Sequence, residues 1–256
     1  MNKIIKKEHL FIACTHGNET TGQSVVNKLL KNPILSNKFD YIIGNPKALE
    51  KNTRFTDVDL NRVAPGKKSS KLYEEQRAYE LVNIFKKYKH VIDIHTTTAN
   101  NRIVIILSKI DIYSLSLALA FNINEILIWP CSDPKSKIGP LTKFKDYGIE
   151  IEIGIKDFNK VAIEKTYKII SKFLLQKSNR ILMNISEIEK KLKTKTIYLV
   201  GGKIQKDDIG VSKLKDHKLF VGKKEQFTML LFGKYLGIFG YKMYKINKNY
   251  ILDKLV

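Results

Sequence analysis

Two histidines and a glutamate follow two apolar runs that are typical of buried strands. His16 and Glu19 come directly after the run at residues 10–14, and His95 closes a second run, HVIDIH. Because ligands of open α/β sheets gather at the carboxyl ends of the strands, we expect these side chains to converge. Two imidazoles and one carboxylate, with a position left for water, form the ligand set of a catalytic zinc site. Taken singly, each residue is also compatible with a hydrogen-bonded structural role.

Further acidic residues lie in the same kind of segment. In GIEIEIG, residues 148–154, Glu150 and Glu152 point to one face because side chains alternate along a strand. Two carboxylates on an apolar strand are unfavourable unless water, a cation or a metal site receives them. A general base at a metal site would meet this requirement, and so would a solvated edge strand. Asp93 is either a partner that orients a ligand or an arginine, or a buried acid held by backbone amides.

The segment at residues 45–62 is dense in polar residues and lacks hydrophobic periodicity. Arg54, Asn61 and Arg62 are suited to binding a carboxylate or polarising a carbonyl oxygen, and a guanidinium group serves both roles better than an ammonium group. Alternatively, the two aspartates of the segment pair with these arginines on a surface loop.

The elements that must position these residues alternate through the first two-thirds of the chain. Apolar runs predict strands at 9–15, 40–45, 90–95, 102–108, 125–130 and 148–154. Apolar residues three and four positions apart predict amphipathic helices at 20–32, 70–88, 111–122 and 157–177. This alternation predicts an α/β fold in which helices sandwich a parallel or mixed sheet.

The pattern changes after about residue 180. Short β-like runs at 196–202, 227–233 and 236–246 are separated by turns rich in glycine and lysine, with one short helical piece at 185–193. We therefore predict two domains, an α/β domain over residues 1–179 and a smaller β-rich domain over residues 180–256.

Composition restricts the class of protein. The 256 residues carry 46 Lys and Arg against 25 Asp and Glu, a net charge of +21 that attracts anions of any kind. We ascribe this charge mainly to compositional drift. No interleaved aromatic and basic motif indicates a specific nucleic-acid partner. No run approaches the roughly 18–20 apolar residues of a membrane span. The first apolar run is shorter than the roughly 7–15 residues of a signal sequence, so we expect a cytoplasmic protein. Cys14 and Cys131 are too few for a disulfide framework, and we expect two small buried thiols.

Five motifs occur together in one order: HGNE, NPKA, TRFTDVDLNR, DIHTTTAN and GIEIEIG. Their order and spacing resemble the aspartoacylase and succinylglutamate desuccinylase family, strongly over about residues 8–155 and loosely beyond. The resemblance implies a zinc carboxypeptidase-like fold, one zinc ion per chain, and a β-rich C-terminal domain that narrows the entrance to the site.

The resemblance also implies roles for individual residues. It assigns the zinc ion to His16, Glu19 and His95, and the general base to Glu152, which with Gly154 matches the Glu-x-Gly pattern of the family. Arg54 would polarise the scissile carbonyl, and Asn61 and Arg62 would bind the substrate carboxylate. Three further residues would line or complete the pocket: Thr96, Thr97 and Tyr250. For Tyr250, packing within the C-terminal domain is an equal alternative.

DIHTTTAN resembles the aspartoacylase version of its motif, which favours hydrolysis of N-acetylaspartate to acetate and aspartate. Two departures weaken this expectation, because Ile138 and Thr142 stand where aspartoacylases carry a tyrosine and an arginine. Lys137 or Lys143 would have to substitute. The alternatives are a succinylglutamate desuccinylase or another hydrolase of small anionic N-acyl amino acids, then a metallocarboxypeptidase, then a basic nucleic-acid-binding protein. A homo-oligomer is compatible with the sequence.

Overall fold

One mixed β-sheet organises the protein. The computed structural model describes residues 7–130, 137–155, 159–176, 181–204, 219–221, 226–230 and 240–255. Its strands are β1 (His9–Ala13), β2 (Phe39–Ile43), β3 (His90–Thr97), β4 (Ile103–Leu107), β5 (Glu125–Ile128), β6 (Tyr147–Gly154), β7 (Thr196–Lys203), β8 (Leu219–Val221), β9 (Gln226–Leu230) and β10 (Tyr241–Ile246). In the described residues they form one ten-stranded sheet in the order β2-β1-β3-β6-β4-β5-β7-β10-β9-β8.

The first half of the sheet is largely parallel. Strands β2, β1, β3 and β6 pair in parallel, and β4 pairs antiparallel with β6. Strand β7 pairs in parallel with β5, and β10, β9 and β8 follow it as antiparallel neighbours. The strands after residue 180 therefore continue the same sheet. The division into domains at residues 1–179 and 180–256 stays a prediction.

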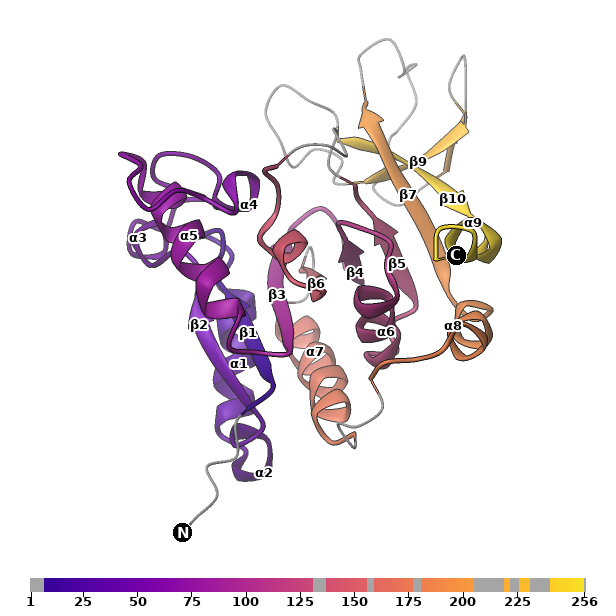
Figure 1. Cartoon of the computed structure of the whole chain (residues 1–256), viewed down its shortest axis with the longest axis horizontal. Helices are drawn as coiled ribbons and strands as arrows, with labels where there is room; N and C mark the ends of the chain where they lie inside the picture. Colours follow the sequence, from indigo (N-terminus) through magenta and orange to yellow (C-terminus); the bar gives the residue numbers. More distant parts are fainter. Residues whose placement is uncertain are drawn as a thin grey trace.

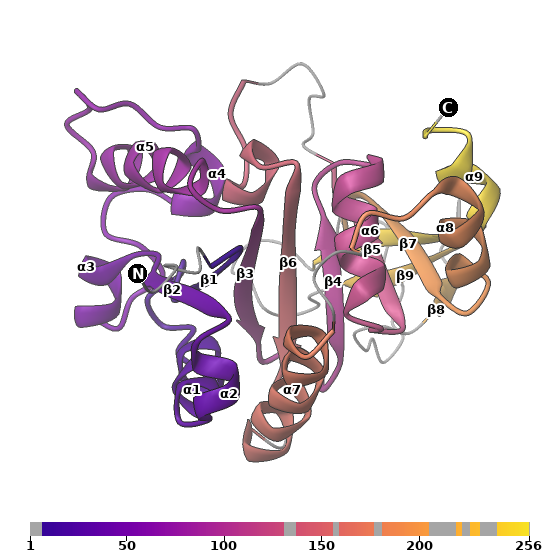
Figure 2. The same cartoon turned by 60° about the horizontal axis from the view of Figure 1, so that its bottom comes forward.

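Helices cover both faces of the sheet. They are α1 (Thr21–Leu30), α2 (Pro33–Ser36), α3 (Pro46–Glu50), α4 (Leu60–Val63), α5 (Tyr73–Phe85), α6 (Ile112–Ala120), the 3-10 helix η1 (Leu141–Phe144), α7 (Asn159–Leu174), α8 (Ile185–Leu192) and α9 (Lys248–Leu252). Figure 1 shows their arrangement, and Figure 2 shows α5 and α7 on opposite sides of the sheet. The expected α/β sandwich is confirmed.

The two faces of the sheet differ in chemistry. Alternate residues of β3 and β6, such as Ile94 and Ile151, join the largest apolar cluster under α1, α6 and α7. Burying each such side chain stabilises the fold by roughly 1.5–3 kcal/mol. The intervening residues of the same strands face the other side, where α4, α5 and η1 pack on the apolar ends of β1 and β3. There Asp93 lies beside Glu150 and His95 lies beside Glu152 in the parallel pairing.

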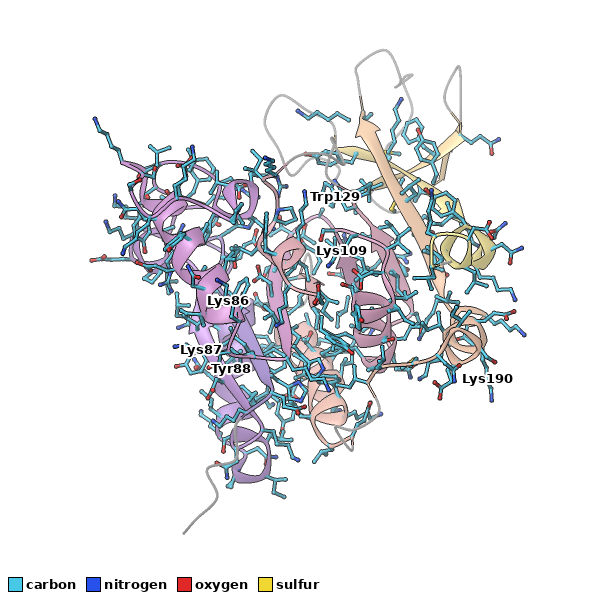
Figure 3. All side chains as sticks on the ribbon, in the orientation of Figure 1. Lys86, Lys87, Tyr88, Lys109, Trp129 and Lys190 are labelled. Carbon is cyan, nitrogen blue, oxygen red and sulfur yellow. The ribbon has the colours of Figure 1, made fainter. Side chains whose placement is uncertain are left out.

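The positive charge of the chain is spread over separate parts of the surface. Lys86 and Lys87 follow α5 at one flank of the molecule, whereas Lys190 lies on α8 at the other (Figure 3). None of the helices in the described ranges combines the length and apolar character needed to span a bilayer. Cys14 is buried, as expected, and Cys131 lies outside the described residues.

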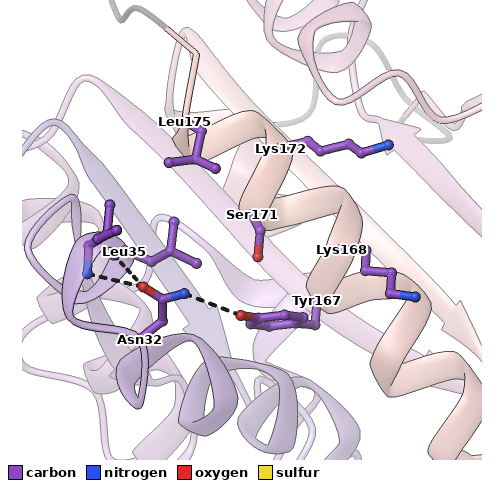
Figure 4. Close-up of a pocket in the computed structure, with 8 residues that line it drawn as sticks. Asn32, Leu35, Tyr167, Lys168, Ser171, Lys172 and Leu175 are labelled. Carbon is purple, nitrogen blue, oxygen red and sulfur yellow. Dashed lines mark hydrogen bonds between the residues drawn. The ribbon is translucent and has the colours of Figure 1, made fainter.

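A surface groove lies between α2 and α7, with a volume of about 350 Å³ (Figure 4). Its lining includes Leu35, Tyr167, Ser171 and Leu175, and the helices that form it pack on the apolar cluster under α1, α6 and α7. None of the residues singled out by the sequence lines this groove. The chemistry must therefore be sought on the opposite face of the sheet.

Candidate metal centre and active site

The loop that carries His16 leaves β1 through a strained residue. Cys14 has a left-handed backbone with φ of 56°, which is uncommon for a residue with a side chain. Its carbonyl oxygen accepts a hydrogen bond from Asn45 N at 2.9 Å, so the turn is fixed by the next polar segment. Backbone strain of this kind is retained where the surrounding structure holds it, and it clusters at functional sites.

Gly17 allows this loop to pack on α3. A Cβ atom at Gly17 would lie 2.0 Å from the carbonyl carbon of Ala48, a contact that no side chain tolerates. Asn45 caps α3 by accepting a hydrogen bond from Ala48 N at 3.1 Å, and Pro46 begins the helix. The HGNE and NPKA motifs thus form one packed unit.

Three predicted metal ligands meet at the ends of β1 and β3. Glu19 lies between the two imidazole rings, with Oε1 3.1 Å from His16 Nδ1 and Oε2 3.2 Å from His95 Nδ1. One ligand atom from each residue lies within 4.8 Å of the other two, and all three residues are buried. This spacing suits a single ion held by nitrogen and oxygen ligands.

The outer nitrogen of each ring also faces a carboxylate. His16 Nε2 lies 3.1 Å from Asp59 Oδ1, and His95 Nε2 lies 3.0 Å from Asp93 Oδ2. A neutral imidazole has only one N–H, so it can donate to the outer aspartate or to Glu19 but not to both. A cation between the two Nδ1 atoms and Glu19 would leave both outer N–H groups for the aspartates, the arrangement common around bound zinc. The donor set therefore fits zinc.

The acids at the centre favour a positive charge close to them. Burial alone would raise the pKa of Glu19, but hydrogen bonds with His16 and His95 hold it well below its usual value. Burial alone would lower the pKa of His95, but Asp93 and Glu19 raise it well above its usual value. Burial, together with the charge of Asp93, raises the pKa of Glu150.

Buried acids gather in this region. Among the described residues no lysine or arginine is as buried as the five acids of the protein interior. These acids lie at the centre, on β6 beside it, or on α5 against residues 56–58: Glu19, Glu74, Asp93, Glu150 and Glu152. Buried charges need compensation, and a divalent cation would supply it.

Arg54 borders the ligands. Its Nε and Nη2 atoms donate to Asp59 Oδ2 at 3.1 and 2.9 Å, and Nη1 donates to Glu19 Oε1 at 3.4 Å. The pair of Arg54 with Asp59 that the sequence suggested therefore exists, but it lies against the candidate centre. With 23% of its side chain exposed, Arg54 is partly accessible to solvent.

Four more of the predicted pocket residues occupy two elements. Asn61 is buried in α4, where Nδ2 donates to Glu150 Oε1 at 3.1 Å and Oδ1 accepts from Leu141 N at 3.0 Å. Arg62 is exposed next to it. On β3, Thr96 N donates to Glu19 Oε2 at 2.9 Å, and Thr97 Oγ1 accepts a hydrogen bond from the backbone of the following loop.

Tyr250 lies apart from these residues. It belongs to α9, which packs on α8 at the flank of the sheet opposite α4 (Figure 1). Its backbone N–H completes the cap of Asn247, and Lys254 Nζ lies 6.0 Å from its ring centroid. A role for Tyr250 in substrate binding stays a prediction.

The two departures from the aspartoacylase pattern have different surroundings. Ile138 is 55% exposed. Thr142 is buried, and its hydroxyl donates to Glu150 Oε1 at 3.3 Å. Lys143 Nζ donates to the carbonyl of Ile138 at 3.3 Å, so this lysine lies along the same segment.

Sequence reasoning missed two residues of the site. Asp59 was expected only as an arginine partner, yet it also contacts His16. Glu74 was not singled out within the helix predicted at 70–88, yet it is fully buried. A signal for Glu74 existed, because it stands in register with the apolar stripe of α5 that continues through Ala78, Leu81 and Phe85.

Comparison with known sequences identifies relatives. The family model of the succinylglutamate desuccinylase/aspartoacylase catalytic domain matches residues 6–175. A probable aspartoacylase of Prochlorococcus marinus (strain AS9601) is 32% identical over 214 residues, which are 76% of this chain and 69% of that protein. The aspartoacylase of Rattus norvegicus is 34% identical over 173 residues, which are 59% of this chain and 54% of that protein.

Solved structures share the fold. Murine aminoacylase 3 matches with a TM-score of 0.68 at 18% identity, over 94% of this chain and 96% of that one. The succinylglutamate desuccinylase from Chromobacterium violaceum matches with a TM-score of 0.67 at 15% identity, over 95% of this chain and 86% of that one. The sheet and its helical layers thus have the zinc carboxypeptidase-like fold. The chain belongs to the succinylglutamate desuccinylase/aspartoacylase family of deacylases.

Proposed function

We propose that the protein is a zinc-dependent deacylase that hydrolyses the amide bond of an N-acyl acidic amino acid, with N-acetylaspartate as the first candidate. The observation that carries this proposal is the buried group of His16, Glu19 and His95 next to Arg54 and the β6 acids. The aspartoacylase names of the sequence relatives support the substrate class.

His16, Glu19 and His95 would hold one zinc ion per chain. When bound, the ion would act as a Lewis acid on the substrate carbonyl and promote ionisation of water. The two aspartates behind the rings would orient the imidazoles and keep the inner nitrogens deprotonated. The three ligands and the two aspartates would thus be arranged for zinc before the ion binds.

Glu152 is the proposed general base. Its strand position is beside His95 on the polar face of the sheet, so its carboxylate would border the place where water and substrate meet. It would take a proton from the attacking water and pass it to the departing amine. Arg54 would donate hydrogen bonds to the carbonyl oxygen as negative charge develops there, which is commonly the largest contribution to lowering the barrier.

Asn61 and Arg62 would bind the carboxylate of the substrate. Arg62 is an exposed residue of α4 whose Nη1 donates to the carbonyl oxygen of Asn61 at 2.9 Å, and one amide hydrogen of Asn61 is held by Glu150. The net charge of +21 would draw small anionic substrates toward the protein. A cytoplasmic location belongs to the same proposal.

The test combines metal analysis of the purified protein with a release assay on N-acetylaspartate, N-succinylglutamate and other N-acyl amino acids. We expect one zinc ion per chain and turnover of at least one acidic substrate. Glu152→Gln should keep the zinc ion and lower kcat by about 100-fold or more, the usual effect of losing a general base. Glu50→Gln, at an exposed position, is the matched control. Unchanged turnover in Glu152→Gln would refute the assignment.

A succinylglutamate desuccinylase is the second candidate, favoured by the fold match to the Chromobacterium violaceum protein. Preference for N-succinylglutamate over N-acetylaspartate in the same assay would select it. Digestion of peptides would instead select a carboxypeptidase.

A further inference from the structure

We propose that Glu74 is a positioning residue that fixes residues 56–58, so that Arg54 and Asp59 on either side of this segment are held against the metal ligands. The inference rests on the proposed function for the role of Arg54. It concerns a buried carboxylate that takes no part in the proposed chemistry.

Glu74 lies in the first turn of α5 and is fully buried. Its Oε1 accepts from Asn45 Nδ2 at 3.0 Å, Thr56 N at 2.7 Å and Thr56 Oγ1 at 2.8 Å. Its Oε2 accepts from Asp57 N at 3.0 Å and Val58 N at 3.2 Å. Five donors exceed the roughly four lone-pair sites of one carboxylate, so Glu74 has no capacity left for a further donor.

The anchored segment connects directly to the candidate site. Arg54 precedes the three bound residues and Asp59 follows them, and these two side chains form the ion pair beside Glu19 and His16. Asn45, which donates to the same carboxylate, also caps the helix on which Gly17 packs. Glu74 therefore connects the segment of NPKA with that of TRFTDVDLNR.

Holding residues 56–58 requires the ionised carboxylate of Glu74. Burial alone would raise its pKa, but the hydrogen bonds from Thr56, Asn45 and Asp57 lower it, so the ionised form is favoured. A glutamine has one accepting oxygen and an NH₂ group. Whichever way that amide is turned, its NH₂ group faces backbone N–H donors and leaves them without an acceptor.

The direct test is hydrogen exchange at the amides of Thr56, Asp57 and Val58. In Glu74→Gln we expect these amides to exchange faster than in the wild-type protein. Glu75→Gln, the same chemical change at the next residue of α5, should leave them unchanged. This readout does not require activity. Unchanged exchange in Glu74→Gln would overturn the proposal.

The second test is a double-mutant cycle with Arg54→Lys in the release assay. If Glu74 acts by placing Arg54, Glu74→Gln should lower kcat by about 10- to 100-fold with a smaller change in KM. The same substitution should have little further effect once Arg54 is replaced. Equal fold-changes in both backgrounds would mean a general structural role and would refute the positioning role.

Two controls keep the result interpretable. Thr56→Val removes only the hydroxyl donor and should shift exchange and kcat in the same direction by a smaller factor, and it serves if Glu74→Gln does not fold. If the wild-type protein hydrolyses no N-acyl amino acid, the proposed function fails while the exchange comparison still decides whether Glu74 anchors residues 56–58.

Discussion

His16 Nε2 lies 3.1 Å from Asp59 Oδ1, and the other oxygen of this carboxylate accepts two hydrogen bonds from Arg54. One aspartate thus joins a candidate metal ligand to the group proposed to polarise the substrate carbonyl. Burial alone would raise the pKa of Asp59, but His16, Arg54 and Arg62 keep it well below its usual value. The ionised form of Asp59 is therefore favoured.

Asp59→Asn should weaken zinc binding. An asparagine can accept a hydrogen bond from His16 but no longer carries the charge that makes the imidazole a better ligand, and loss of such a partner costs about 10- to 100-fold in metal affinity. Competition with a chromophoric chelator measures the change. Asp146→Asn, at an exposed side chain, is the control. Equal zinc affinity in wild type and Asp59→Asn would contradict the role.

Gly17→Ala should destabilise the loop that carries His16. The added Cβ would lie 2.0 and 2.2 Å from the carbonyl carbon and oxygen of Ala48 and 2.3 Å from Leu49 N, so the loop or α3 must move. Overpacking of this kind costs roughly 1–3 kcal/mol, to be read from the midpoint of urea unfolding. Gly202→Ala is the matched control, because a Cβ there meets nothing within 4 Å. Equal midpoints for the two variants would show that the loop tolerates the displacement.

The alternation of apolar and polar residues in the sequence predicted which side chains of β3 and β6 share a face. In HVIDIH and GIEIEIG, isoleucines alternate with four polar residues, and the structure turns the isoleucines to the apolar cluster. The four polar residues that share the other face are Asp93, His95, Glu150 and Glu152. The short helices α2 and α3 were not predicted, because four or five residues cannot show helical periodicity. Their signal was an Asn-Pro pair, with the asparagine as cap and the proline in the first turn.

Tertiary contacts explain what the sequence could not show. The bond between Asn61 and Glu150 joins residues 89 positions apart, and nothing in either motif specifies it. The continuation of the sheet from β5 to β7 likewise depends on strand pairing between segments that looked different in pattern. Contacts of this kind depend on which faces meet after folding, so local patterns leave them undetermined.

Glu150→Gln and Glu152→Gln should separate the two acids of β6. Asn61 and Thr142 both donate to Oε1 of Glu150, so a glutamine oxygen in that place can still accept from both. We expect kcat of Glu150→Gln to stay within about fivefold of wild type, the effect of roughly 1 kcal/mol for one altered hydrogen bond. Steady-state kinetics of the two variants side by side measure this difference. A larger loss of kcat in Glu150→Gln than in Glu152→Gln would exchange their roles.

A buried histidine pair should make stability depend on pH at the opposite ends of β1 and β3. The Nδ1 atoms of His9 and His90 lie 3.1 Å apart, and the rings stack with centroids 4.8 Å apart. Burial and, to a smaller extent, the charges of Lys38 and Lys89 lower the pKa of His9 to about 4. Burial and, to a smaller extent, the charges of His9, Lys89 and Lys145 lower the pKa of His90 to about 3.

The unfolded chain takes up protons at these histidines near pH 6.5, whereas the native state does so only near their lowered pKa values. The contribution of these two neutral histidines to the free energy of unfolding is therefore complete above pH 6.5. It is lost as the pH falls toward 4, by up to about 1.4 kcal/mol per pH unit for each histidine. Urea unfolding between pH 7.5 and 4.5 measures the slope. His90 packs against the ring of Tyr147, and phenylalanine can fill its place. His90→Phe should reduce the slope of the unfolding free energy against pH by up to about 1.4 kcal/mol per pH unit, because one titrating histidine is lost and the others remain. Identical slopes for the wild-type and His90→Phe proteins would show that the pair does not control acid stability.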